Sequence, residues 1–256
     1  MLNNELWNNP SAGAYEIAYS ARLDFDSNSY LNFSPSTATS RDVMTMSFWF
    51  KIGGTAGASG NKHVFLTSGT SGSAYAFLEL DTNHKINGSE MTGIAFGASD
   101  ETFSDTSVWY HMVYRYDSSQ GTQANRLRIY INGTQITLGS TSNFGSGEDH
   151  PYWNASNMYI GNKSGIGHAV EGADFVFADW IFIDGSSLAP TSFANDDTGS
   201  WLPIDPSDLT FGNNGFWLDF AINDDLGNDV SGNNNDWTAN NMGTDHRITD
   251  TPTNPA

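Results

Sequence analysis

Trp109-Tyr-His-Met-Val-Tyr-Arg-Tyr-Asp117 and Leu127-Arg-Ile-Tyr-Ile-Asn-Gly133 are the two stretches of sequence that decide the fold class. Apolar and polar residues alternate in both, which is typical of strands with one buried face, because successive side chains along a strand point to opposite faces. Asn132-Gly133 can supply the two positive φ angles of a tight hairpin turn into a strand over 134–138. The two stretches are therefore predicted to be neighbouring core strands.

The same alternation continues along the chain. In Met44-Thr-Met-Ser-Phe-Trp-Phe-Lys51 every second residue is large and apolar, so Met44, Met46, Phe48 and Phe50 are expected to face the core. Further strands are expected near 21–25, 30–33, 62–67, 75–80, 92–97, 157–161, 174–183 and 216–220, between clusters of Gly, Asn, Asp and Ser. A helical turn is indicated only at 187–194, where Pro190 could begin it. About a dozen short strands favour an all-β, two-sheet antiparallel jelly-roll sandwich.

Composition narrows the classes of function. The 256 residues can bury a full core as one domain, and the absence of Cys excludes disulfides, thiolate-bound zinc and a Cys nucleophile. A formal net charge of −19 repels phosphate backbones, so no nucleic-acid partner is expected. Residues 1–19 lack the pattern of a signal peptide and no apolar run approaches a bilayer span, so no membrane insertion is expected.

The two opening stretches together resemble the most recognisable part of concanavalin A-like (laminin G-like) domains. In that family an aromatic-His strand is followed by a strand that ends in Asn-Gly, as at Trp109–Asp117 and Leu127–Gly133 here. The resemblance implies the two-sheet sandwich already expected from the alternation. It identifies a fold more than a site.

A narrower resemblance connects the chain with modules of marine and cyanobacterial tailed-phage structural proteins. It rests on Leu23-Asp-Phe25 near Tyr30-Leu31, Asp179-Trp-Ile-Phe-Ile-Asp-Gly185 with Leu188, Pro190 and Phe193, Asn214-Gly-Phe-Trp-Leu-Asp-Phe220, Asp229-Val-Ser-Gly-Asn-Asn-Asn-Asp-Trp-Thr238 and Asp250-Thr-Pro-Thr-Asn254. It implies a non-enzymatic virion protein, such as a capsid decoration, head fibre or tail appendage, made in the host cytoplasm and placed on the virion surface. The implied partners are other virion proteins, further copies of the chain and host cell-surface glycans.

Two other functions stay open at this point, a stand-alone carbohydrate-binding module and a glycan hydrolase. The expected organisation is an N-terminal arm for attachment over 1–19, with an unstructured leader as the alternative, a sandwich over 20–239 and a polar tail over 240–256. The tail is expected to lie along a surface or to reach a neighbour.

The sequence contains only weak matches to the residue patterns of known catalytic sites. Glucanases of this fold carry closely spaced carboxylates on one strand, and the nearest match is Glu79 with Asp81, for which exposed strand-end charges are the simpler interpretation. His111 lies inside the fold-determining stretch and is expected to be structural. The remaining histidines lack the spacing of a zinc site.

A calcium site is predicted in Asp224-Asp-Leu-Gly-Asn-Asp-Val-Ser-Gly-Asn233, with Asp224, Asp225 and Asp229 as ligands, since carboxylates in a glycine-bent loop suit this cation. The alternative is an Asx-type turn at Asp229, in which the side chain caps the following amides.

A carbohydrate site is predicted in Glu148-Asp-His-Pro-Tyr-Trp-Asn154. There, Tyr152 and Trp153 could stack on a sugar ring while Asp149, His150 and Asn154 bind its hydroxyls. The alternative is that the two aromatic residues are buried plugs or interface anchors.

Overall fold

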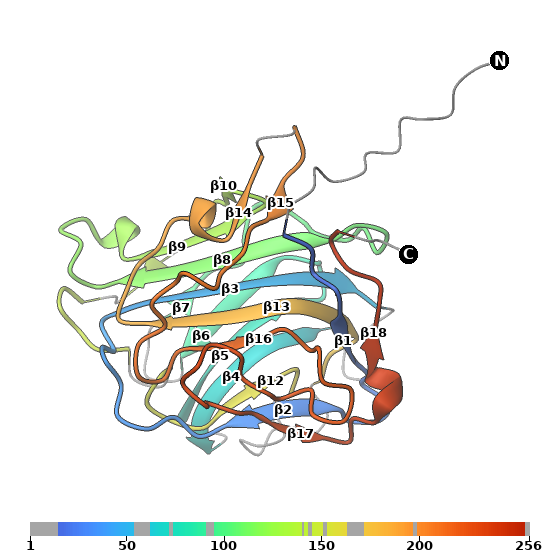
Figure 1. Cartoon of the computed structure of the whole chain (residues 1–256). Helices are drawn as coiled ribbons and strands as arrows, with labels where there is room; N and C mark the ends of the chain where they lie inside the picture. The colour runs from blue at the N-terminus through green and yellow to red at the C-terminus, as the bar shows by residue number, and fades with distance from the viewer. Residues whose placement is uncertain are drawn as a thin grey trace.

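The computed structural model describes residues 15–53, 62–71, 74–90, 95–139, 141–142, 145–150, 153–162, 172–196 and 199–253. Two eight-stranded sheets, antiparallel at every pairing, stack face to face in this part of the chain (Figure 1). The all-β sandwich expected from the alternating sequence is therefore confirmed.

The first sheet has the order β10-β9-β8-β3-β13-β1-β18, and β16 also pairs with β13. Its strands are β1 (Ser20–Leu23), β3 (Val43–Ile52), β8 (Tyr110–Asp117), β9 (Leu127–Ile131), β10 (Thr134–Gln135), β13 (Phe175–Asp184), β16 (Phe216–Leu218) and β18 (Arg247–Ile248).

The second sheet has the order β11-β7-β6-β5-β4-β12-β2-β17. Its strands are β2 (Tyr30–Phe33), β4 (His63–Ser71), β5 (Ala74–Leu80), β6 (Ile86–Glu90), β7 (Ala95–Phe96), β11 (Thr141–Ser142), β12 (Met158–Ile160) and β17 (Thr238–Asn240). Outside both sheets, β14 (Ala194–Asn195) pairs with β15 (Leu202–Pro203), and the described helices are the short 3-10 turns η1 (Gln123–Asn125), η3 (Pro190–Ser192) and η4 (Thr244–His246). No described helix is long and apolar enough to cross a membrane.

The main core lies between the sheets and follows the predicted alternation. Met44, Met46, Phe48 and Phe50 of β3 are fully buried, and Met112, Leu127, Ile129 and Ile131 of β8 and β9 are buried as well. Trp109 begins the first of the two predicted core strands, but its side chain packs on the opposite face of the first sheet and donates from Nε1 to Asp250 Oδ1 at 3.1 Å. The reason is geometric: Trp109 and Tyr110 are adjacent, so they cannot share a face.

The predicted hairpin is confirmed. Asn132 and Gly133 have left-handed backbone, with φ angles of 48° and 77° respectively, and Thr134 pairs with Ile131. A side chain at Gly133 would also collide with the ring of Trp201, since a Cβ there would lie 2.7 Å from it. The returning strand is shorter than expected, because β10 ends at Gln135.

The outer face of the first sheet is covered by the chain itself. Two further apolar clusters lie on it, one containing Val113, Ile181, Ile183, Phe193 and Phe211, the other containing Ile17, Trp49, Ala178 and Ala194. In Figure 1 the segment that follows β13 crosses the front of this sheet. The first sheet is thus buried on both faces, which explains why all ten residues of β13 are buried.

The described parts of the two expected extensions belong to the sandwich. Residues 1–14 lie outside the described residues, but Ile17 packs on the first sheet. In the tail, β18 pairs with β1, and Asp250 forms an ion pair with Lys51 at 2.7 Å. The tail up to residue 253 is therefore part of the fold, because it supplies an edge strand and a partner for a largely buried cation.

Candidate functional site

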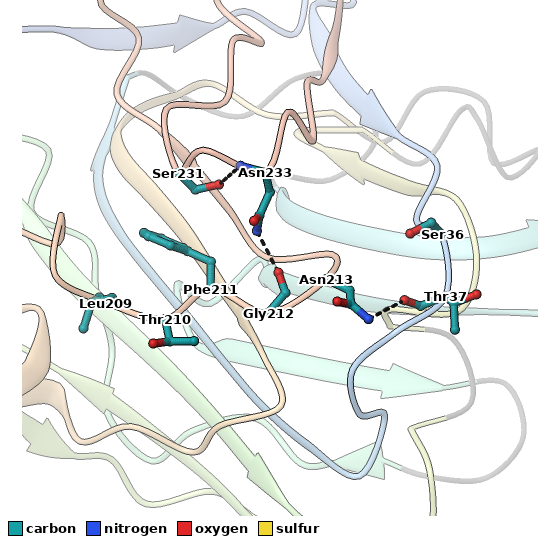
Figure 2. Close-up of a pocket in the computed structure, with 9 residues that line it drawn as sticks. All are labelled: Ser36, Thr37, Leu209, Thr210, Phe211, Gly212, Asn213, Ser231 and Asn233. Atoms are coloured by element: carbon teal, nitrogen blue, oxygen red, sulfur yellow. Dashed lines mark hydrogen bonds between the residues drawn. The ribbon is translucent and has the colours of Figure 1, made fainter.

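An open pocket of ≈ 730 Å³ lies where three loops meet (Figure 2). The loops are the connection between β2 and β3, the segment that leads into β16, and the turn after Asp229. The pocket is lined by Ser36, Thr37, Leu209, Thr210, Phe211, Gly212, Asn213, Ser231 and Asn233. The sequence predicted a site only in the third of these loops, for calcium, and no pattern in the sequence joins the three loops.

Asp184, at the end of β13, holds two of these loops together. Its buried carboxylate accepts four hydrogen bonds, from the backbone N–H groups of Thr39, Ser40 and Asn214 at 2.7–3.0 Å and from Asn154 Nδ2 at 2.7 Å. Gly212 passes so close to the Asp184 carbonyl that a Cβ would collide with it, and its φ of +78° also favours glycine. Charge-assisted bonds of this kind position the pocket loops rigidly.

Asp229 organises the third loop in the same way. Its carboxylate accepts hydrogen bonds from Trp217 N (2.9 Å), Ser231 N (2.9 Å), Ser231 Oγ (2.8 Å) and Asn235 N (2.9 Å). The Asx-type turn is therefore the arrangement that the structure has at this position.

The pocket surface is polar and uncharged. Asn233 Nδ2 donates to the carbonyls of Gly212 (2.7 Å) and Gly215 (2.8 Å), and Asn213 lies beside Thr37 across the pocket in Figure 2. Thr37 and Thr210 are exposed, whereas the ring of Phe211 is buried in the neighbouring apolar cluster. Hydroxyl and amide groups with a small apolar component suit a ligand that combines hydroxyl groups with C–H surfaces.

The predicted calcium site is not formed. Asp224 and Asp225 are exposed, while the buried carboxylate of Asp229 is occupied by the donors of its own turn. Within the described residues, which include all three aspartates, no group of three or more Asp, Glu or His side chains could hold a metal ion. The prediction was wrong because closeness in sequence does not make the three carboxylates converge.

The predicted carbohydrate platform is not formed either. Trp153 is 2% exposed and stacks on Tyr114 with ring centroids 4.9 Å apart, and its backbone N–H donates to His150 Nδ1, so both side chains are buried plugs. Asp149 is exposed and lies 3.5 Å from Arg41, and Tyr152 lies outside the described residues. Asn154 is also buried, where it bonds Asp184 and accepts from Asn214 Nδ2 at 2.7 Å. Asn154 thus supports the pocket from beneath instead of contacting a ligand.

The candidate catalytic residues occupy structural positions. His111 is buried, with Nε2 2.8 Å from Ser47 Oγ, and its Nδ1 accepts a hydrogen bond from Trp201 Nε1 at 3.0 Å. Burial lowers the pKa of His111 to about 3. Because an indole N–H occupies the nitrogen that an orienting carboxylate would need, Ser47 and His111 lack the third member of a triad.

Glu79 and Asp81 are not a pair of exposed strand-end charges. Glu79 is fully buried and lies 3.0 Å from Lys62 Nζ. Asp81 Oδ1 instead accepts from Asn83 N and Lys85 N in the turn after β5. The two carboxylates therefore serve an ion pair and a turn.

Another buried acid, besides Asp184, was not recognised from the sequence. Asp179 lies in a bulge of β13 with φ of 43°, and its carboxylate accepts from Tyr15 Oη (2.7 Å) and Trp217 Nε1 (2.9 Å). Burial raises the pKa of Asp179 to about 7. An aspartate in the middle of an otherwise apolar strand was the signal that could have identified it.

Comparison with known proteins agrees with the fold. Residues 25–180, more than half of the chain, match the family model of the concanavalin A-like lectin/glucanases superfamily (Laminin_G_3). No protein of the curated set matches the sequence.

Three solved structures are similar to this chain at low sequence identity. A "putative carbohydrate binding protein" from Bacteroides ovatus ATCC 8483 is 14% identical with a TM-score of 0.62, and the match covers 88% of this chain and 59% of that one. The heptameric SAP-like pentraxin of Limulus polyphemus is 15% identical with a TM-score of 0.47, covering 69% of this chain and 80% of that one. Domains LG4-5 of the mouse laminin α1 chain are 12% identical with a TM-score of 0.45, covering 68% and 43%. The chain belongs to the concanavalin A-like lectin/glucanase superfamily.

Proposed function

We propose that the protein is a non-enzymatic carbohydrate-binding sandwich that serves as a structural protein on the surface of a tailed-phage virion. The observation that carries carbohydrate binding is the pocket between the three loops. Its lining offers hydroxyl and amide groups together with part of Phe211, and two buried carboxylates hold the loops in place. A pre-formed, polar and partly apolar pocket is what recognition of a sugar requires.

The test removes two pocket hydroxyls without changing side-chain shape. Thr37→Val with Thr210→Val should weaken binding of bacterial surface polysaccharide by about tenfold, because each lost hydrogen bond is worth roughly 0.5–1.5 kcal/mol. Thr134→Val, on the exposed edge strand β10, is the matched control and should bind as the wild type does. If calorimetry gave equal binding for the wild type, the double variant and the control, the sugar would have to bind outside this pocket.

The absence of enzymatic activity is part of the proposal. It is supported by His111, whose Nδ1 accepts from Trp201, and by Glu79, which is buried against Lys62. Incubation with the same polysaccharides should release no new reducing ends. Release of reducing ends that Glu79→Gln abolishes, in a protein that melts normally, would establish a glycan hydrolase instead.

The virion role rests on the sequence resemblance to phage structural modules, which extends from about residue 20 to 254. The proposed partners are other virion proteins and further copies of the chain, with host glycans as the outward contact. Electron microscopy of purified particles with the protein labelled should place it on the capsid, head fibre or tail. A protein that is absent from washed particles but binds polysaccharide would be a stand-alone carbohydrate-binding module.

A further inference from the structure

We infer that the pocket between the three loops recognises an uncharged glycan directly, without a bridging metal ion. The inference rests on the proposed carbohydrate binding and narrows it to one chemical class of ligand. It is drawn from the hydrogen bonds of Asp184 and Asp229 and from the side chains that line the pocket.

Metal-bridged binding of a sugar needs carboxylate oxygens that still have lone pairs for the cation. A carboxylate offers about four acceptor positions. Asp184 and Asp229 each accept four hydrogen bonds from N–H or O–H groups of the pocket loops and of the residues that adjoin them. A cation at either carboxylate would therefore have to displace donors that hold the pocket together.

The charges around the pocket disfavour an anionic sugar. None of the nine lining residues carries a charged side chain, and the two buried carboxylates lie behind them. Seven of the nine belong to the sequence between Lys163 and Arg247, which contains fourteen Asp and Glu but no Lys or Arg. An acidic sugar would find no cation among the lining residues, whereas the hydroxyls of a neutral sugar match the Thr, Ser and Asn groups.

The experiment compares one glycan in two charge states. Neutral bacterial polysaccharides are tested first, and those that bind are then oxidised at C6, which converts primary hydroxyls to carboxylates without changing the backbone. Kd is measured by calorimetry in excess calcium and in EDTA. We expect the neutral glycan to bind equally in both, and the oxidised glycan to bind at least about tenfold more weakly at low salt.

A variant with an added cation checks that the selectivity arises at this pocket. Thr210→Lys loses the same hydroxyl as Thr210→Val but adds an ammonium group to the pocket, so it should bind the oxidised glycan more tightly than the single variant Thr210→Val does. Thr134→Lys, on exposed β10 outside the pocket, adds the same charge and should restore less of that binding.

The outcomes separate the inference from the proposed function. Equal affinity for neutral and oxidised glycans, or binding that EDTA abolishes, would overturn the inference while carbohydrate binding stands. If the folded protein bound no neutral or oxidised glycan, the proposed function itself would fail. Equal recovery by Thr210→Lys and Thr134→Lys would assign the selectivity to the net charge of the chain and overturn the role given to the pocket.

Discussion

Replacing Asp179 by Asn should make the protein more stable at neutral pH and should remove one source of its pH dependence. The carboxylate of Asp179 is buried in the β13 bulge, and its two hydrogen-bond donors are the uncharged groups Tyr15 Oη and Trp217 Nε1. Asn keeps the size of the side chain and can still accept from Trp217, so the substitution removes the charge and little else.

The magnitude follows from the raised pKa. Burial raises the pKa of Asp179 from 3.8 to about 7 in the native state, while the unfolded chain keeps the ordinary value. Between pH 4 and 7 the native state therefore binds a proton that the unfolded state has lost, so the free energy of unfolding falls as pH rises through this range. Three pKa units correspond to about 4 kcal/mol. Below pH 4 the carboxyl is protonated in both states and the cost disappears.

The assay is urea unfolding of the wild type and Asp179→Asn at a series of pH values. The two proteins should be nearly equally stable at about pH 4, and the variant should become more stable by up to about 4 kcal/mol above pH 7. Asp208→Asn, at an exposed position, is the control and should follow the wild type at every pH. A stability difference between wild type and Asp179→Asn that does not change with pH would refute the reasoning.

Three further predictions test the fold and the pocket loops. Ile129→Asp should prevent folding, because it places an unpaired charge in the main core, and a soluble variant with a normal melting curve would contradict the strand assignment. Gly133→Ala should lower the free energy of unfolding, measured in urea, by about 1 kcal/mol or more. The added methyl group is strained at a φ of +77° and collides with the ring of Trp201. Unchanged stability would argue against the hairpin turn. Asp229→Ala should lower the melting temperature, because it leaves Trp217 N, Ser231 N and Asn235 N without their acceptor. The wild-type protein should have the same melting curve in calcium and in chelator. A higher melting temperature in calcium than in chelator would show that the protein does bind this metal ion.

The strands and their facing were predictable from the sequence because they depend on neighbours in the chain. Alternation over Met44–Lys51 and Leu127–Ile131 determines which side chains can share a face, and Asn132-Gly133 determines where the chain can turn. The short strand β6 was not predicted from its alternation. It contains Gly88, over which the ring of Phe96 packs, so its pairing depends on a partner strand and not on its own pattern.

The candidate site was decided by tertiary structure. The Asp184 carboxylate joins backbone groups near residue 40 to groups near residue 214, and it also binds Asn154. No spacing in the sequence predicts that these segments lie together. The burial of Trp153 was also decided by tertiary structure. Its indole ring would suit a sugar platform, but it is buried against Tyr114 because of how the sheets stack. The sequence alone determined which residues alternate and turn, since those preferences act over a few residues. Only the packed structure decided which polar groups are buried as scaffolding and which face a ligand, because burial depends on segments that are distant along the chain.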